Sequence, residues 1–178
     1  MADTQVARRY AQAILNIALD EGSISEWRSD IDDVAFLLNN SEAAQVLLSN
    51  SISIEKRYAI VDEALKDVRK NARNFTKLLI KKGRTKEAQS INETFNKLAD
   101  QVEGICHAEI TTAVELKGSK LDEITKRIAD SLKMKVVTTS RVDEDLVGGI
   151  IIRIGDHLID GSLRTRLREL HRELKGAQ

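Results

Sequence analysis

The spacing of apolar residues changes near Gly104, and this change divides the 178-residue chain into two parts that must fold differently. Before that point, apolar residues recur every three or four positions, which is the period of an amphipathic helix. From Cys106 to Lys117 they alternate with polar residues, which is the period of a half-buried strand. The pattern predicts a mainly α protein, in which an N-terminal six-helix bundle (residues 1–104) is followed by a smaller mixed α/β domain (residues 105–178).

Six apolar stripes at helical spacing, separated by short polar connections, precede the change of period. Gly22 is expected to close the first helix, Ser23 and Glu26 to form a capping box on the second, and Ser41 to cap the third. The fourth stripe continues to Val68. The sequence contains no proline, where average usage of about 5% gives roughly nine, so nothing in it forces a helix to kink or break.

The second part is expected to begin with a long strand and a helix. The strand that starts at Cys106 should run to Lys117, because the alternation continues that far and Gly118 follows it. Ser119 and Asp122 then predict the capped start of a helix.

Strands, a hairpin and a final helix complete the second part. The Val-rich and Thr-rich segment 136–142 and the apolar segment 147–154, which contains Gly148-Gly149, are both predicted as strands. Gly155-Asp156 is expected to form a two-residue hairpin turn. Asp160-Gly161-Ser162 should end the returning strand and cap a last helix. Four leucines fall in line along that helix: Leu163, Leu167, Leu170 and Leu174.

The residue types that carry catalysis or bind metals show no site-like pattern. His107, His157 and His171 fall on a strand, a hairpin and a helix, without the spacing of metal ligands. Asp156 next to His157 resembles a base and its orienting carboxylate, but a polar hairpin tip is the favoured interpretation. The single cysteine, Cys106, lies on the apolar side of its strand, which favours a small buried side chain over a nucleophile. We therefore expect no catalytic residue, metal site or cofactor.

The glycines leave a second hypothesis open. Gly148-Gly149 and Gly161-Ser162 would suit a small enzyme or nucleotide-binding protein if their backbone met a phosphate at the start of a helix. Neither Gly-x-x-x-x-Gly-Lys-Ser/Thr nor Gly-x-Gly-x-x-Gly occurs in the chain. Glycine within a strand usually marks a bulge or a close backbone approach, so a structural role is favoured.

Charge and hydropathy exclude several classes of protein. Lys+Arg and Asp+Glu balance at 28 each, which argues against a nucleic-acid or membrane-surface binder. Aromatic residues make up only 3%, too few for a platform that stacks nucleic-acid bases. Apolar runs such as Val147 to Ile152 are too short to span a bilayer, and the first residues lack the apolar core of a secretory signal. A soluble adaptor is predicted, and its first helix, apolar on more than one face, suits a groove for a partner helix.

Three stretches resemble the delta subunit of F-type ATP synthase, whose mitochondrial counterpart is the oligomycin-sensitivity-conferring protein. The first is Ala7-Arg8-Arg9-Tyr10-Ala11-Gln12-Ala13. The second consists of Asn74-Phe75, Leu78-Leu79 and Gly83-Arg84. The third is the strongest and comprises Val142-Asp143, Leu146-Val147-Gly148-Gly149, Ile152, Gly155-Asp156, Ile159-Asp160-Gly161-Ser162 and Arg166-Leu167. The resemblance spans essentially the whole chain.

The resemblance implies a non-catalytic stator subunit in the peripheral stalk of a proton-translocating ATP synthase, present once per complex. Such a subunit links the catalytic α/β head to the membrane-anchored b subunits. The link resists rotary torque and so keeps proton flow coupled to ATP synthesis. The implied location is the cytoplasmic face of the bacterial plasma membrane, with the stromal side of the chloroplast thylakoid as the alternative.

The resemblance also implies binding residues. In the family, the N-terminal helix of an α subunit lies in a groove between the first and fifth helices, and the C-terminal domain engages the distal ends of the b subunits. The matching groove positions are Tyr10, Ala13, Ile14, Ile17, Leu78 and Leu79, with Trp27 nearby. The C-terminal motif residues are expected to define turns rather than a ligand site: Gly148, Gly149, Gly155, Asp156, Asp160, Gly161 and Ser162.

Overall fold

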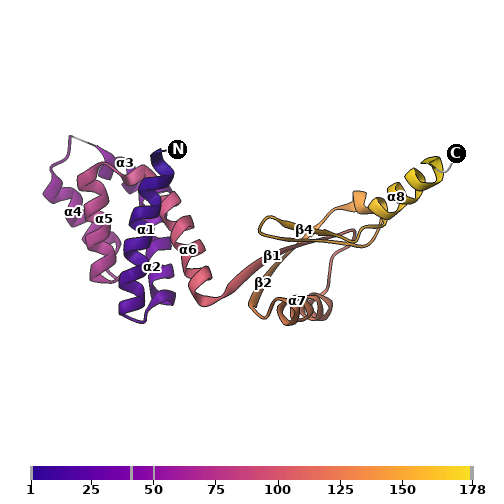
Figure 1. Ribbon diagram of the computed structural model, residues 1–178. Helices are drawn as coiled ribbons and strands as arrows, with labels where there is room; N and C mark the ends of the chain where they lie inside the picture. The colour runs from indigo at the N-terminus through magenta and orange to yellow at the C-terminus, as the bar shows by residue number, and fades with distance from the viewer. Residues whose placement is uncertain (1, 41, 50, 177–178) are drawn as a thin grey trace. The chain divides into compact units, whose positions relative to one another are not determined.

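The computed structural model describes residues 2–40, 42–49 and 51–176. Contacts divide the chain into two compact units, residues 1–99, called the helical unit, and residues 100–178, called the α/β unit (Figure 1). The protein is mainly helical, and the α/β unit contains a small four-stranded mixed sheet. The predicted boundary at residue 104 lies at the end of α6 (Ala88–Glu103), whose last residues belong to the second unit.

The helical unit is built from helices packed around one apolar core. Its elements are α1 (Ala2–Asp20), α2 (Ile24–Asn40), α3 (Glu42–Leu48), α4 (Ile54–Ala64), α5 (Lys70–Lys82), a short 3-10 helix η1 (Thr85–Glu87) and most of α6. Trp27, Ile31, Leu79, Ile91 and Phe95 are fully buried and come from α2, α5 and α6. The helical apolar periodicity therefore marks the faces that these helices turn inward.

One helix end and one predicted cap in this unit differ from the sequence prediction. The fourth helix ends at Ala64, although its stripe was expected to extend to Val68. Leu65 and Val68 are nevertheless buried, so the apolar spacing continues through a turn that still faces the core. The Ser23 hydroxyl donates to Glu21 and accepts from Arg69, and the Ser23 N–H donates to the Ala18 carbonyl rather than to the Glu26 carboxylate, as the predicted capping box would require. The predicted cap Ser41 lies outside the described residues.

The α/β unit is a sheet with one helix on one face. Its elements are β1 (Ile105–Thr112), α7 (Gly118–Leu132), β2 (Lys135–Val142), a 3-10 helix η2 (Glu144–Leu146), β3 (Ile150–Ile154), β4 (His157–Asp160) and α8 (Leu163–Gly176). The strand order is β2-β1-β3-β4, in which β2 is parallel to β1 and the other pairs are antiparallel. The crossover helix α7 lies against the sheet, where the Thr125 and Thr138 hydroxyls are 2.8 Å apart (Figure 1).

The strand from Cys106 was predicted to reach Lys117, but β1 ends at Thr112. The Thr112 hydroxyl donates to the Val114 carbonyl at 2.7 Å, which turns the chain away from the sheet despite the continuing alternation. The helix that follows begins at Gly118 with Lys117 in the N-cap position and no side-chain cap, so the capping role predicted for Ser119 is wrong.

Turns near the end of the chain follow the prediction more closely. Gly155-Asp156 forms the two-residue hairpin, since Ile154 pairs with His157 and Gly155 has a φ of 55°. Gly148-Gly149 was predicted inside a strand but precedes β3, in the turn after η2. These two glycines pack against residues 161–163, and this contact between segments distant in the sequence sets their conformation.

Candidate functional site

An apolar groove of about 720 Å³ lies between α1 and α5 in the helical unit. Its lining comes from both helices, and Trp27 of α2 adds to it. The lining residues are Arg9, Tyr10, Ala13, Ile14 and Ile17 of α1, Asn71, Asn74, Phe75 and Leu78 of α5, and Trp27. Only Arg9 is charged among them, so the groove suits an apolar occupant more than an ionic ligand.

One side of α1 packs against the core of the helical unit. Ala7, Ala11 and Ala18 are fully buried, which brings the α1 backbone close to the core. Ile14 and Leu15 are buried on the same side, whereas Ile17, about 100° around the helix from Ala18, keeps 41% of its surface exposed. Leu78 of α5 is 40% exposed. Large apolar side chains gathered in one concave surface are typical of a protein-binding site.

An aromatic contact connects the two walls of the groove. The Tyr10 and Phe75 rings meet edge to face, with centroids 5.9 Å apart and planes at 63°. Such pairs favour a fixed geometry and add about 0.5–1.5 kcal/mol beyond the area that they bury. The contact therefore holds α1 and α5 at a set spacing.

A polar network around Arg69 holds one end of the groove. The Arg69 guanidinium donates to the Asp30 carboxylate and to the Ser23 hydroxyl, the latter at 2.8 Å, and lies 4.8 Å from the centre of the Trp27 ring. Glu21 accepts from the Trp27 indole N–H at 3.1 Å and from the Asn71 amide at 2.9 Å. The network joins the α1–α2 turn, α2 and the start of α5, so it positions Trp27 at the groove.

We expect Arg69→Ala to lower the free energy of unfolding of the helical unit by about 2 kcal/mol, because the nearly buried Asp30 loses its charged donor. Urea unfolding followed by the fluorescence of Trp27, the single tryptophan, measures this change. Arg73→Ala is the matched control, since Arg73 lies 3.9 Å from the half-exposed Asp62, and a change within about 0.5 kcal/mol is expected. Equal losses in the two variants would contradict the role given to the network.

All but one of the residues that were predicted to form the α-subunit groove line this groove. Tyr10, Ala13, Ile14, Ile17, Trp27 and Leu78 line it. Leu79 does not, because it lies about 100° further around α5 than Leu78 and is fully buried in the core. Phe75 was missed as a lining residue, although its spacing of three from Leu78 was the available signal. Among the polar lining residues, Arg9 and Asn74 stood in stretches that resemble the family but were not assigned to the groove, and Asn71 carried no signal.

The C-terminal glycines form a close backbone contact, which we call the glycine clasp: Gly148 and Gly149 against Gly161 and Ser162. A Cβ on Gly149 would lie 2.4 Å from the Gly161 carbonyl oxygen and 2.8 Å from the Ser162 Cα, and the Gly149 φ is 89°. Gly161 N–H donates to the Ile150 carbonyl at 2.8 Å, and Leu163 N–H donates to the Gly148 carbonyl at 3.0 Å. Backbone fills the space in which a phosphate would have to lie, so these glycines serve the fold.

Asp160 fixes the start of α8 beside the clasp. Its carboxylate accepts from the Ser162 N–H at 2.9 Å and from the Thr165 hydroxyl at 2.8 Å, while the Ser162 hydroxyl accepts from the Thr165 N–H. These hydrogen bonds, the Ser162 N–H first, hold the pKa of Asp160 below its ordinary value. The expected cap of the last helix is thus confirmed, with Asp160 and Ser162 acting together.

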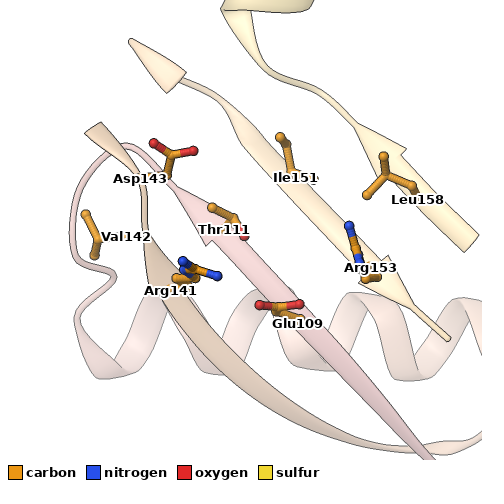
Figure 2. A pocket seen from close by; sticks show the side chains of 8 residues that line it. All are labelled: Glu109, Thr111, Arg141, Val142, Asp143, Ile151, Arg153 and Leu158. Carbon is orange, nitrogen blue, oxygen red and sulfur yellow. The ribbon is translucent and has the colours of Figure 1, made fainter. Parts of the chain in front are cut away.

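A second concave surface, of about 490 Å³, lies on the sheet face opposite α7 (Figure 2). Its polar lining combines Glu109, Arg141, Asp143 and Arg153, and the rest comes from Thr111, Val142, Ile151 and Leu158. Figure 2 shows that the two arginines stand on different strands on either side of Glu109. The lining is thus mainly polar and charged, and it contains no histidine, cysteine or serine.

Residues 2–40, 42–49 and 51–176 contain no group of three or more His, Cys, Asp or Glu side chains placed to hold a metal ion. No helix within those ranges combines the length and apolar character needed to cross a membrane.

Comparison with known proteins gives one consistent family. A family model described as ATP synthase delta (OSCP) subunit matches residues 6–174. The chain is 33% identical over 178 residues to ATP synthase subunit delta of Moorella thermoacetica, covering 99% of this chain and 100% of the relative. It is 35% identical over 174 residues to the subunit of the same name from Anaeromyxobacter sp. (strain K), covering 96% and 97%.

A solved structure shares the fold. A chain in the cryo-EM structure of the Toxoplasma gondii mitochondrial ATP synthase hexamer matches with a TM-score of 0.67 at 14% sequence identity. The match covers 94% of this chain and 96% of that chain. Similar backbones at such low identity indicate that the fold tolerates extensive replacement of side chains.

Proposed function

Because the chain belongs to the ATP synthase delta (OSCP) subunit family, we propose that its helical unit holds the catalytic head and its α/β unit holds the peripheral stalk. The subunit is a structural part of that stalk and not the catalytic part of the enzyme. Helices α1–α6 act as one six-helix bundle with the groove on its surface. One copy per complex sits at the cytoplasmic face of the bacterial membrane.

The observation that carries this proposal is the groove between α1 and α5. Its occupant is the N-terminal helix of an α subunit, which lays an apolar face against Ile17, Leu78 and the Tyr10–Phe75 pair. Helix-in-groove binding uses apolar anchors spaced three or four residues apart, and α1 with its 19 residues is long enough to contact several helical turns. The buried alanines and the Arg69 network keep this surface preformed, which lowers the entropic cost of binding.

The stator role follows from the two attachments. Rotation of the central shaft exerts torque on the catalytic head, and a head that turned with the shaft would leave proton flow uncoupled from ATP synthesis. Resistance to torque requires slow dissociation under load, which buried apolar contacts supply better than exposed ion pairs. The α/β unit completes the link by engaging the distal ends of the b subunits.

Titration of the full chain with a peptide of the first 25 or so residues of the α subunit tests the proposal. Trp27 is buried in the wall of the groove, so its fluorescence should change in a saturable way as the peptide fills the groove, and calorimetry should give one peptide per chain. The control peptide carries aspartate at two of its apolar anchors and should not bind. Absence of saturable binding by the natural peptide would contradict the assignment of the groove.

A further inference from the structure

Arg9 is the one charged residue in the lining of the groove between α1 and α5. Its side chain is exposed, and no carboxylate in the described part of the chain forms an ion pair with it. A guanidinium has five N–H donors and no acceptor, so it can be satisfied only by oxygen atoms. The free helical unit therefore leaves these donors available to whatever fills the groove.

Positive charge gathers at the Arg9 end of the groove. The helices α1 and α5 run antiparallel, because the Asn71 amide at the start of α5 donates to Glu21 just after the end of α1. The last turn of α5, which is basic, is therefore directed toward the first half of α1. Residues 1–10 contain two Arg and one Asp, and the last turn of α5 adds two Lys. The local field at this end favours a carboxylate.

The acidic end of α1 offers no comparable free charge to an occupant. Glu21 follows this end, but its carboxylate lies 3.6 Å from the Arg69 guanidinium and also accepts from the Trp27 indole N–H. Neither Glu21 nor its neighbour Asp20 lines the groove. Arg9 is thus the charged residue that a helix lying in the groove must meet.

We propose that Arg9 selects the occupant of the groove by binding a carboxylate of the partner helix, on an Asp or Glu that flanks its apolar anchors. This inference rests on the proposed function and names the polar feature that the α-subunit helix must present. Arginine suits the role, because its planar guanidinium can bind a carboxylate through two parallel N–H···O bonds.

The apolar walls and Arg9 divide the work of recognition between them. Apolar burial supplies affinity for any amphipathic helix of the right shape, because it does not depend on direction. A helix with a basic or apolar residue opposite Arg9 would cover the guanidinium without satisfying it, and that loss rejects the wrong helix. Arg9 is therefore a specificity-determining residue of the groove.

The test is a calorimetric titration of the full chain with the α-subunit peptide from the same organism, at low and moderate salt. Arg9→Glu should weaken binding about 30-fold at low salt and less at moderate salt, since a charge-assisted hydrogen bond is lost and a repulsion is added. Arg9→Lys keeps the charge without the planar pair of donors and should lose about fivefold.

Arg8→Glu is the matched control. Arg8 is exposed, makes the same change of net charge and lies about 100° around α1 from Arg9, outside the lining of the groove. Its variant should bind within about threefold of the wild type. The circular dichroism spectrum of every variant should match that of the wild type, because both arginines are exposed.

Peptide variants identify the carboxylate. Each Asp or Glu of the peptide is replaced in turn by Lys, and one replacement should weaken binding to the wild type while restoring binding to Arg9→Glu. If the wild type binds the natural peptide and Arg9→Glu binds it within threefold, the role of Arg9 is overturned and the assignment of the groove stands. Equal losses in Arg8→Glu and Arg9→Glu, or a loss that no peptide replacement reverses, would also overturn it. If the wild type does not bind the natural peptide, the assignment of the groove fails together with this inference.

Discussion

Leu78→Glu is expected to weaken binding of the α-subunit helix at least 100-fold while the helical unit stays folded. Leu78 lines the groove and is 40% exposed in the free chain, so a glutamate there remains hydrated until the partner covers it. Binding would then lose about 2 kcal/mol of apolar burial and would also bury a charge without a partner. A 100-fold change corresponds to about 2.7 kcal/mol. Calorimetric titration with the α-subunit peptide measures the loss.

Leu19→Glu is the matched control for this substitution. Leu19 lies on α1, is 44% exposed and does not line the groove, so its variant should bind within about threefold of the wild type. In reconstituted membranes, Leu78→Glu should also reduce ATP synthesis driven by a proton gradient, whereas Leu19→Glu should not. Equal affinities of the two variants for the peptide would show that the α helix binds elsewhere.

Gly149→Ala is expected to destabilise the α/β unit by about 3 kcal/mol or more and to leave the helical unit folded. The added Cβ would overlap the Gly161 carbonyl oxygen, and a φ of 89° is itself strained for alanine. Every Trp, Tyr and Phe lies in residues 1–99, so Trp27 fluorescence reports the helical unit alone. Hydrogen exchange of the strand amides and far-ultraviolet circular dichroism report the loss in the α/β unit.

Gly118→Ala is the matched control for Gly149→Ala. Gly118 begins α7, its Cβ position is open and its φ is not left-handed, so alanine should be neutral or stabilise the unit by up to about 1 kcal/mol. Similar unfolding curves for Gly149→Ala and the wild type would mean that the clasp relaxes at low cost. The clasp would then not fix the start of α8.

Local chemistry explains which parts of the fold were predictable. The helical stripes, the Gly155-Asp156 hairpin and the cap before α8 each depend on residues close together in the sequence. At the end of β1, the Thr112 hydroxyl donates to the Val114 carbonyl. The strand ends there although apolar and polar residues continue to alternate beyond it. Gly148-Gly149 was misplaced for a similar reason, because its conformation is set by residues 161–163.

The groove, too, could be predicted only where it depends on residues close together in the sequence. The apolar sides of α1 and α5 follow from spacing, but their pairing across a groove came from the family resemblance. Leu79 was assigned to the groove because it follows Leu78 in the same family-like stretch. One residue further along a helix turns the side chain by about 100°, which here moves it from the groove into the core. The Arg69 network could not be anticipated, since it joins residues 39 and 46 positions apart through contacts that exist only in the folded chain.

The position of β1 decides how the α/β unit responds to tension. The chain passes from α6 through Gly104 directly into β1, which is an inner strand of the sheet. It is paired with β2 along its whole length and with β3 over Ala108–Thr112. A pull along β1 must shear these ladders together, whereas a pull on an edge strand can unzip its bonds one after another. The connection between the units therefore enters the sheet at an inner strand, which resists extraction more than an edge strand would.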